Sequence, residues 1–135
     1  MSNIAAEKIF LAGVVAKPLR LLDFLDYLSE DDFQHSATKM TFAAIRSLVM
    51  NKEANAISKA KLVAEAKALG NQNYLSATRD GAWIDEMMQE RVEDHELVEH
   101  FLEIKRQTLK GNYERSFDEM KDYLRSTSDP LSMMI

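Results

Sequence analysis

Cysteine is absent from this 135-residue chain, and glycine and proline are scarce, at 4 and 2 residues. The absence of cysteine excludes disulfide frameworks, thiolate nucleophiles and cysteine-based zinc sites. The scarcity of glycine and proline removes most of the turn chemistry that an all-β fold needs between its short strands. Together these absences favour a protein built from a few long helices.

Basic charge and long apolar runs are also lacking. The formal net charge is −5, which argues against a domain that grips a phosphate backbone, because that task needs clustered lysine and arginine. No apolar run approaches membrane-spanning length, and residues 1–4 lack the basic stretch of a signal peptide. These features predict a cytoplasmic protein that has no membrane contact.

Hydrophobic residues make up 46% of the sequence and charged residues 29%, which suits one folded domain. Apolar residues recur at helical spacing and predict an all-α fold, a compact domain of about five to six helices followed by a long C-terminal helix. The helices are expected at residues 4–16, from Pro18 along Leu19, Leu22, Leu25 and Leu28, at 36–50, after Ser58 to Gly70, at 82–90, and at 94–125.

Several positions within this pattern carry specific expectations. Gly13 lies inside the first helix and predicts a close approach of a neighbouring helix, because it has no Cβ. Gly70 stands where a glycine commonly ends a helix. Phe33, Phe42 and Ile45 are predicted to be buried core residues that join the second and third helices.

The last predicted helix carries two apolar stripes. The first contains Leu97, Phe101 and Ile104, and the second contains Tyr113, Phe117, Met120 and Leu124. At about 100° per residue, the step from Ile104 to Tyr113 turns the stripe by about 180°. A continuous helix would leave the second stripe exposed for self-association or a partner. A break near Gly111 would instead fold both stripes into one core as a helical hairpin, and the sequence leaves both alternatives open.

The division of the chain follows from this pattern. Residues 1–92 are expected to form a globular helical subdomain, and residues 93–125 a long helix or hairpin arm. Residues 126–135 begin with the linker-like run Ser126-Thr127-Ser128-Asp129-Pro130 and end on apolar residues. This last segment is expected to be a linker or the truncated start of the hairpin return.

No catalytic or metal-binding motif is found in the sequence. There is no GxxxxGK[ST] or GxGxxG phosphate loop among the four glycines. His95 and His100 are five residues apart, which is poor spacing for two metal ligands on one helix face. They lie among Glu93, Asp94 and Glu96, so a solvated acidic surface is the preferred interpretation. We therefore expect no catalytic, cofactor-binding or metal-binding residues in this segment.

Short motifs nevertheless occur in a characteristic order. They are Ala6-Glu7-Lys8 within a run ending at Gly13, then Asp32-Phe33, then Phe42-Ala43-Ala44-Ile45, and finally Trp83-Ile84 through Lys105-Arg106-Gln107. In this order they resemble the N-terminal domain of DnaB-type replicative helicases, most closely the phage branch. Lys8 replaces the family's glutamine, Ser36 its proline and Thr38 its histidine. The resemblance covers roughly residues 5–125.

The resemblance implies a non-catalytic collar domain of a hexameric DNA helicase, acting in DNA replication. It implies a hairpin helix that pairs subunits and a contact surface for primase or a helicase loader. ATP and Mg²⁺ would bind a C-terminal domain beyond this segment, which would make the full-length protein an ATP-dependent helicase. Tyr113, Phe117, Met120 and Leu124 are the candidate residues for self-association or partner binding.

The alternative function is that of a free-standing helical adaptor, such as a helicase loader or a regulatory protein that binds a protein partner. The two functions differ in whether the natural reading frame continues past Ile135 into a Walker-type ATPase. Under either function, we expect the segment alone neither to hydrolyse ATP nor to bind duplex DNA tightly at physiological salt.

Overall fold

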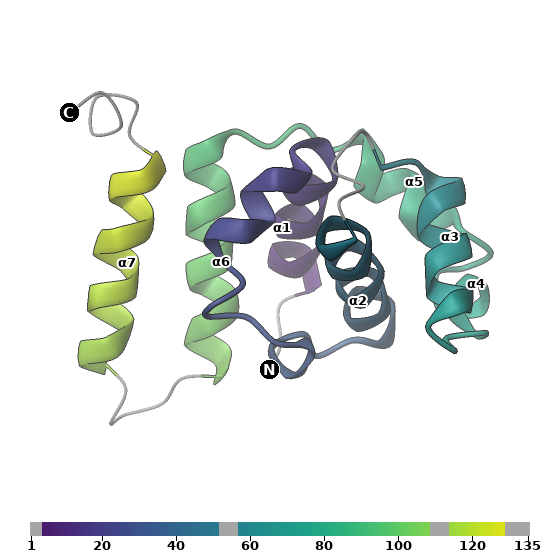
Figure 1. The fold of residues 1–135 in the computed structure, drawn as a ribbon, viewed down its shortest axis with the longest axis horizontal. Coiled ribbons are helices and arrows are strands. Elements are labelled where there is room, and N and C mark those ends of the chain that lie inside the picture. The colour runs from purple at the N-terminus through teal and green to yellow at the C-terminus, as the bar shows by residue number, and fades with distance from the viewer. Residues whose placement is uncertain (1–3, 52–56, 109–113, 129–135) are drawn as a thin grey trace.

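The computed structural model describes residues 4–51, 57–108 and 114–128, and in α7 it describes the side chains of residues 119–126. Its secondary structure over these ranges is helical (Figure 1), which confirms the predicted all-α class. The elements are α1 (Ile4–Ala16), the 3-10 helices η1 (Pro18–Asp23) and η2 (Glu30–Asp32), α2 (Ser36–Met50), α3 (Lys59–Ala68), α4 (Tyr74–Ala77), α5 (Ala82–Gln89), α6 (Asp94–Thr108) and α7 (Glu114–Ser128).

The helices are arranged side by side along the long axis of the molecule (Figure 1). Helix α1 lies at the centre and packs against α2, α5 and α6, while α2 packs in turn against α3. Helix α7 contacts α6 at one end, and α3, α4 and α5 lie together at the other end. Helix α6 shares one hydrophobic core with α1, and the division of the chain at residue 92 stays a prediction.

Several local predictions are confirmed. Helix α1 has the predicted bounds, and a Cβ placed on Gly13 would lie 2.7 Å from Leu97 Cδ1 on α6, so the close approach is present. The Lys61 N–H donates to Ser58 Oγ at 3.2 Å, which makes Ser58 the N-cap of α3. Gly70 follows that helix with a φ of +90°. The short helix α4 was not predicted.

Phenylalanine rings of α1, α2, α6 and the segments that follow η1 and η2 meet at the centre of the core. Phe10 of α1 lies edge-on to Phe24, with ring centroids 5.2 Å apart, and Phe24 lies 4.9 Å from Phe101 of α6. Phe33 and Phe42 stack with centroids 4.7 Å apart. All five rings are fully buried, and Ile45 is buried with them, so the predicted core of Phe33, Phe42 and Ile45 is confirmed.

The predicted leucine stripe after Pro18 is wrong in part. This segment forms a 3-10 helix, in which residues three apart project in the same direction. Leu19 and Leu22 therefore share one side and are 61% and 51% exposed, whereas Leu21 is fully buried. Residues three apart lie on about the same side of either type of helix, and the side that carries Leu19 and Leu22 faces away from the core.

The alternative of one continuous C-terminal helix is also wrong, and the alternative of a helical hairpin is confirmed. Arg125 of α7 lies 2.8 Å from Glu99 of α6, whereas a continuous helix would separate these residues by about 39 Å. Figure 1 shows α6 and α7 side by side and antiparallel. Met120 and Leu124 are buried in the same core as α6. Gly111, the predicted position of the break, lies outside the described residues.

Tyr74 connects α4 to α2 through a buried hydrogen bond. The Thr41 Oγ1 and the Tyr74 hydroxyl lie 2.7 Å apart, and either can be the donor. Thr41 Oγ1 also lies 2.7 Å from the Ala37 carbonyl, to which it can donate. The Tyr74 side chain is 1% exposed. Burial raises the pKa of Tyr74 to about 12, because the phenolate is poorly solvated there, although the Thr41 hydrogen bond opposes the shift.

Truncation of Phe42 to alanine should lower the free energy of unfolding by about 3–5 kcal/mol, because a fully buried ring would leave a cavity. Urea denaturation at neutral pH measures this change. The matched control is Met50→Ala on the same helix, where the side chain is 61% exposed and the cost should stay below about 0.5 kcal/mol. Equal costs for the two variants would show that Phe42 is not in the core.

The buried Tyr74 phenol predicts a loss of stability in strong base. Between about pH 10 and 12 the unfolded chain loses this proton while the folded chain keeps it, so stability falls as pH rises. The expected slope is about 1.4 kcal/mol per pH unit relative to Tyr74→Phe, which has no such proton. Urea denaturation of both proteins at several pH values in this range gives the free energy of unfolding as a function of pH. If the two proteins lose stability at the same rate, the pKa of Tyr74 is not raised.

Candidate functional site

The most unusual polar residue of the structure is Glu7, a carboxylate in the apolar helix α1 that is only 1% exposed. Its Oε1 accepts the Thr38 hydroxyl at 2.6 Å and the Gln34 N–H at 3.0 Å. Both donors belong to the start of α2 and the turn before it. Hydrogen bonds to an ionised group are stronger than neutral ones, so this carboxylate ties α1 to α2.

His35 lies beside the second oxygen of the same carboxylate. Its Nε2 is 4.0 Å from Glu7 Oε2, and the imidazole is 34% exposed. Glu7 Oε2 is buried and makes no hydrogen bond to the described residues.

Asp32 forms the second buried polar contact. Lys105 Nζ of α6 lies 3.0 Å from Asp32 Oδ1, and the two side chains are only 11% and 7% exposed. Asp32 Oδ2 also accepts the Ser29 N–H at 2.9 Å, which closes the turn of η2. This ion pair holds the α6 helix against the turn that precedes α2.

These contacts explain why two of the sequence motifs contain acidic residues. Glu7 of the first motif and Asp32 of the second are both covered by protein, so neither carboxylate can approach a substrate. Each holds elements together that are distant in sequence: α1 with α2, and η2 with α6. The described residues around them support an architectural role for the motifs.

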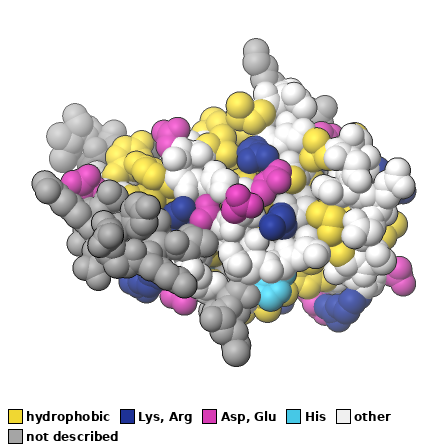
Figure 2. All heavy atoms as spheres, turned by 90° about the horizontal axis from the view of Figure 1, so that it is seen from below, with side chains coloured by type: hydrophobic (Ala, Val, Ile, Leu, Met, Phe, Trp, Pro, Cys, Tyr) yellow, Lys and Arg dark blue, Asp and Glu magenta, His cyan; other side chains and the backbone are white. Residues whose placement is uncertain are grey.

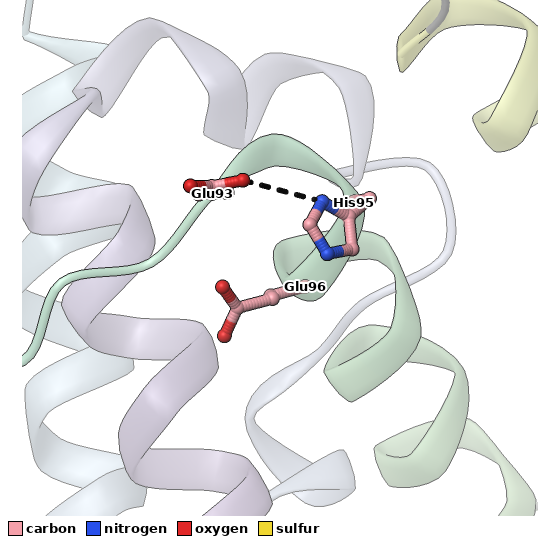
Figure 3. A group of neighbouring side chains, drawn as sticks. All are labelled: Glu93, His95 and Glu96. Atoms are coloured by element: carbon pink, nitrogen blue, oxygen red, sulfur yellow. Dashed lines mark ion pairs between the residues drawn. The ribbon is translucent and has the colours of Figure 1, made fainter.

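The described residues contain one group with metal-ligating atoms close together, formed by Glu93, His95 and Glu96 at the start of α6 (Figure 3). The three ligand atoms lie within 4.8 Å of one another, and His95 Nδ1 is 3.6 Å from Glu93 Oε2. Glu93 and His95 are 77% and 74% exposed. Acidic residues in a first helical turn stabilise the helix dipole, which accounts for this cluster without a metal.

Two of the four predicted association residues lie within the described part of the structure, and self-association through this set stays a prediction. Met120 and Leu124 are 5% and 0% exposed, because α7 turns them onto α6. Tyr113 and the side chain of Phe117 lie outside the described residues. Among the described side chains of α7, Tyr123 is an exposed aromatic residue that the sequence reasoning did not single out: it is 50% exposed, and its ring centroid lies 6.4 Å from that of Tyr27.

The face of the molecule seen in Figure 2 shows no basic groove of the kind that binds nucleic acid. On the face seen in Figure 2, lysine and arginine side chains lie among aspartate and glutamate side chains rather than in one basic patch. Phosphate-backbone binding depends on such a patch. Among the described residues, no helix is both long enough and apolar enough to cross a membrane.

The fold and the buried contacts define a helical domain whose motif residues maintain its architecture. A comparison with protein families identifies this class: residues 1–106 match the family described as the DnaB-like helicase N-terminal domain. The chain therefore belongs to that family, as its sequence motifs indicated. Comparisons with curated proteins and with solved structures gave no match.

Sequence reasoning identified Glu7 and Asp32 as motif residues but did not predict what they do. The signal for Glu7 was its position inside an otherwise apolar stretch, where an acidic residue has to be paired or hydrogen-bonded. Lys105 gave no comparable signal, because it stands in a helix rich in charged residues. Its burial depends on how α6 packs against η2.

Replacing Lys105 with methionine should lower the free energy of unfolding by about 3–5 kcal/mol, because Asp32 would remain charged and buried without its cation. The double variant Lys105→Met, Asp32→Asn should recover part of this loss. The control is Arg125→Met, which breaks an ion pair whose side chains are about half exposed and should cost less than about 1 kcal/mol.

Urea denaturation of the four proteins measures these differences. If Lys105→Met and Arg125→Met cost the same small amount, the Asp32–Lys105 pair does not hold α6 in place. If the double variant is less stable than Lys105→Met alone, the loss does not come from an unpaired carboxylate.

Proposed function

We propose that this chain is the non-catalytic N-terminal collar domain of a hexameric replicative DNA helicase. In this role it contributes to subunit association and to the binding of primase or a helicase loader, while a separate ATPase domain binds ATP and Mg²⁺. The observation that carries the proposal is the family match over residues 1–106. The motifs that the sequence shares with this family lie at the structural contacts described above.

The distribution of polar residues supports a role in protein binding. The carboxylates of Glu7 and Asp32 are buried and bonded within the domain, so they are not available to a partner. A partner protein would therefore contact the outer faces of the helices. On α7 the side facing α6 buries Met120 and Leu124, whereas Glu119, Asp122 and Tyr123 are exposed. Tyrosine is enriched in protein interfaces because it offers a large rigid apolar ring with a polar end.

The hairpin therefore offers a different association surface from the one first predicted. Tyr123 lies one residue before the buried Leu124 and points to the solvent side of α7, next to the half-buried Tyr27. Tyr123 of the hairpin and Tyr27 of the segment after η1 form an aromatic pair at the surface that suits a contact with another subunit. Met120 and Leu124 would not touch the other subunit but would hold α7 against α6, and so keep Tyr123 in position.

Sedimentation of the purified chain over a wide concentration range tests the proposal. We expect concentration-dependent self-association, weakened about tenfold by Tyr123→Ala, which removes an exposed ring without opening the core. The control Met50→Ala also removes a large exposed side chain, but from α2, and should associate like the unchanged protein.

The same proteins are then mixed with the primase and the helicase loader of the source organism. A chain that stays monomeric up to about 1 mM and binds neither protein would contradict the proposed function. Association that Tyr123→Ala and Met50→Ala leave equally strong would retain the function but exclude the tyrosine pair as its surface.

A further inference from the structure

Helix α3 is apolar over a wider arc than the core covers. Leu62 and Ala66 face the core and are fully buried. Ala60, Val63, Ala64 and Lys67 follow the i, i+3, i+4, i+7 spacing of a second helix face. Ala60, Ala64 and Lys67 are exposed and Val63 is partly buried, so this second face lies at the surface.

The second face forms an open apolar groove with a lysine at each end. The groove is lined by Lys59, Ala60, Val63, Ala64 and Lys67. Lys59 is held in position: its Nζ lies 2.9 Å from Asp85 Oδ2, and its Cε occupies the space that a Cβ on Gly81 would take. Lys67 is one residue before the last position of the helix and is exposed.

The charge of α3 is opposite in sign to that of the whole chain. The helix contains the lysines 59, 61 and 67 and the single acidic residue Glu65, which gives it a net charge of +2. The chain has a formal net charge of −5. A positive helix favours a negatively charged partner surface over the same positive helix of a second copy of the chain.

We propose that the α3 groove, bounded by Lys59 and Lys67, binds an acidic amphipathic helix of a partner protein. The inference rests on the proposed function of protein binding and names the chemistry of one partner. Ala60 and Ala64 allow a close approach of the partner backbone, so large apolar side chains of the partner helix fill the groove over Val63. One carboxylate on its edge pairs with the exposed Lys67, and a second approaches Lys59, whose ammonium group also contacts Asp85.

The spacing of the lysines specifies the partner further. Lys59 and Lys67 are eight residues apart, or about 12 Å along the helix axis. A helix packed nearly parallel or antiparallel to α3 meets both lysines when its carboxylates are seven or eight residues apart. Its leucine, methionine or phenylalanine residues then recur at the i, i+3, i+4, i+7 spacing between them.

A synthetic helical peptide of about 20 residues provides the probe. It carries leucines at i, i+3, i+4 and i+7 and two glutamates eight residues apart, with a fluorescent label at one end. A second peptide has lysines in place of those two glutamates. Fluorescence anisotropy with the whole chain should give a Kd of tens of micromolar for the glutamate peptide and at least tenfold weaker binding for the lysine peptide.

Two variants with the same charge change locate the binding surface. Lys67→Glu should weaken binding of the glutamate peptide about tenfold, because it replaces an attraction between opposite charges with a repulsion. The same variant should strengthen binding of the lysine peptide, because a glutamate then faces a lysine. Lys39→Glu makes the same change at an exposed position of α2, outside the groove, and should leave both affinities within about twofold. Circular dichroism checks that both variants keep the helical content of the unchanged protein.

The inference is overturned if the glutamate peptide does not bind at about 100 µM, or if Lys67→Glu and Lys39→Glu affect the two peptides alike. These failures are separate from failure of the proposed function. If primase or a loader binds the chain and Lys67→Glu does not change that affinity, the domain binds partners and the α3 groove is not their site.

Discussion

The Glu7 carboxylate is enclosed by protein, and an enclosed charge is tolerated only where donors reach it. The Thr38 hydroxyl and the Gln34 N–H supply those donors, so the start of α2 has to lie against α1. Helix α1 in turn packs against α5 and α6, and α2 packs against α3. A wrong placement of α1 and α2 would therefore leave Glu7 unsatisfied and displace most of the other helices.

The ion pair between Asp32 and Lys105 extends the same arrangement to α6, and α6 provides the surface on which α7 folds back. The acidic motif residues Glu7 and Asp32 thus hold the helices of the domain together. The two proposed binding surfaces, the Tyr123 side of α7 and the lysine-bounded groove of α3, lie on outer faces of the domain. This separation fits a domain that works by holding other proteins.

Much of the fold could be predicted because its signals are local. The period of apolar residues fixed the bounds of α1, and Ser58 and Gly70 marked the two ends of the α3 helix. Leu19 and Leu22 were misplaced because a 3-10 helix and an α-helix carry similar leucine spacings over one or two turns. The hairpin stayed undecided because Met120 and Leu124 suit a core and an interface equally well. The role of Glu7 depends on a partner 31 residues away, which no local pattern shows.

A double-mutant cycle between Glu7 and Thr38 tests the central claim most directly. Glu7→Met, Thr38→Val and the double variant are compared with the unchanged chain by urea denaturation, and the coupling energy is the departure of the double variant from additivity. A tether of a buried carboxylate to a hydroxyl predicts a coupling of about 1.5–3 kcal/mol, with the double variant more stable than the sum of the two single losses allows. A coupling near zero would contradict the account, because α1 and α2 would then be held together without this contact.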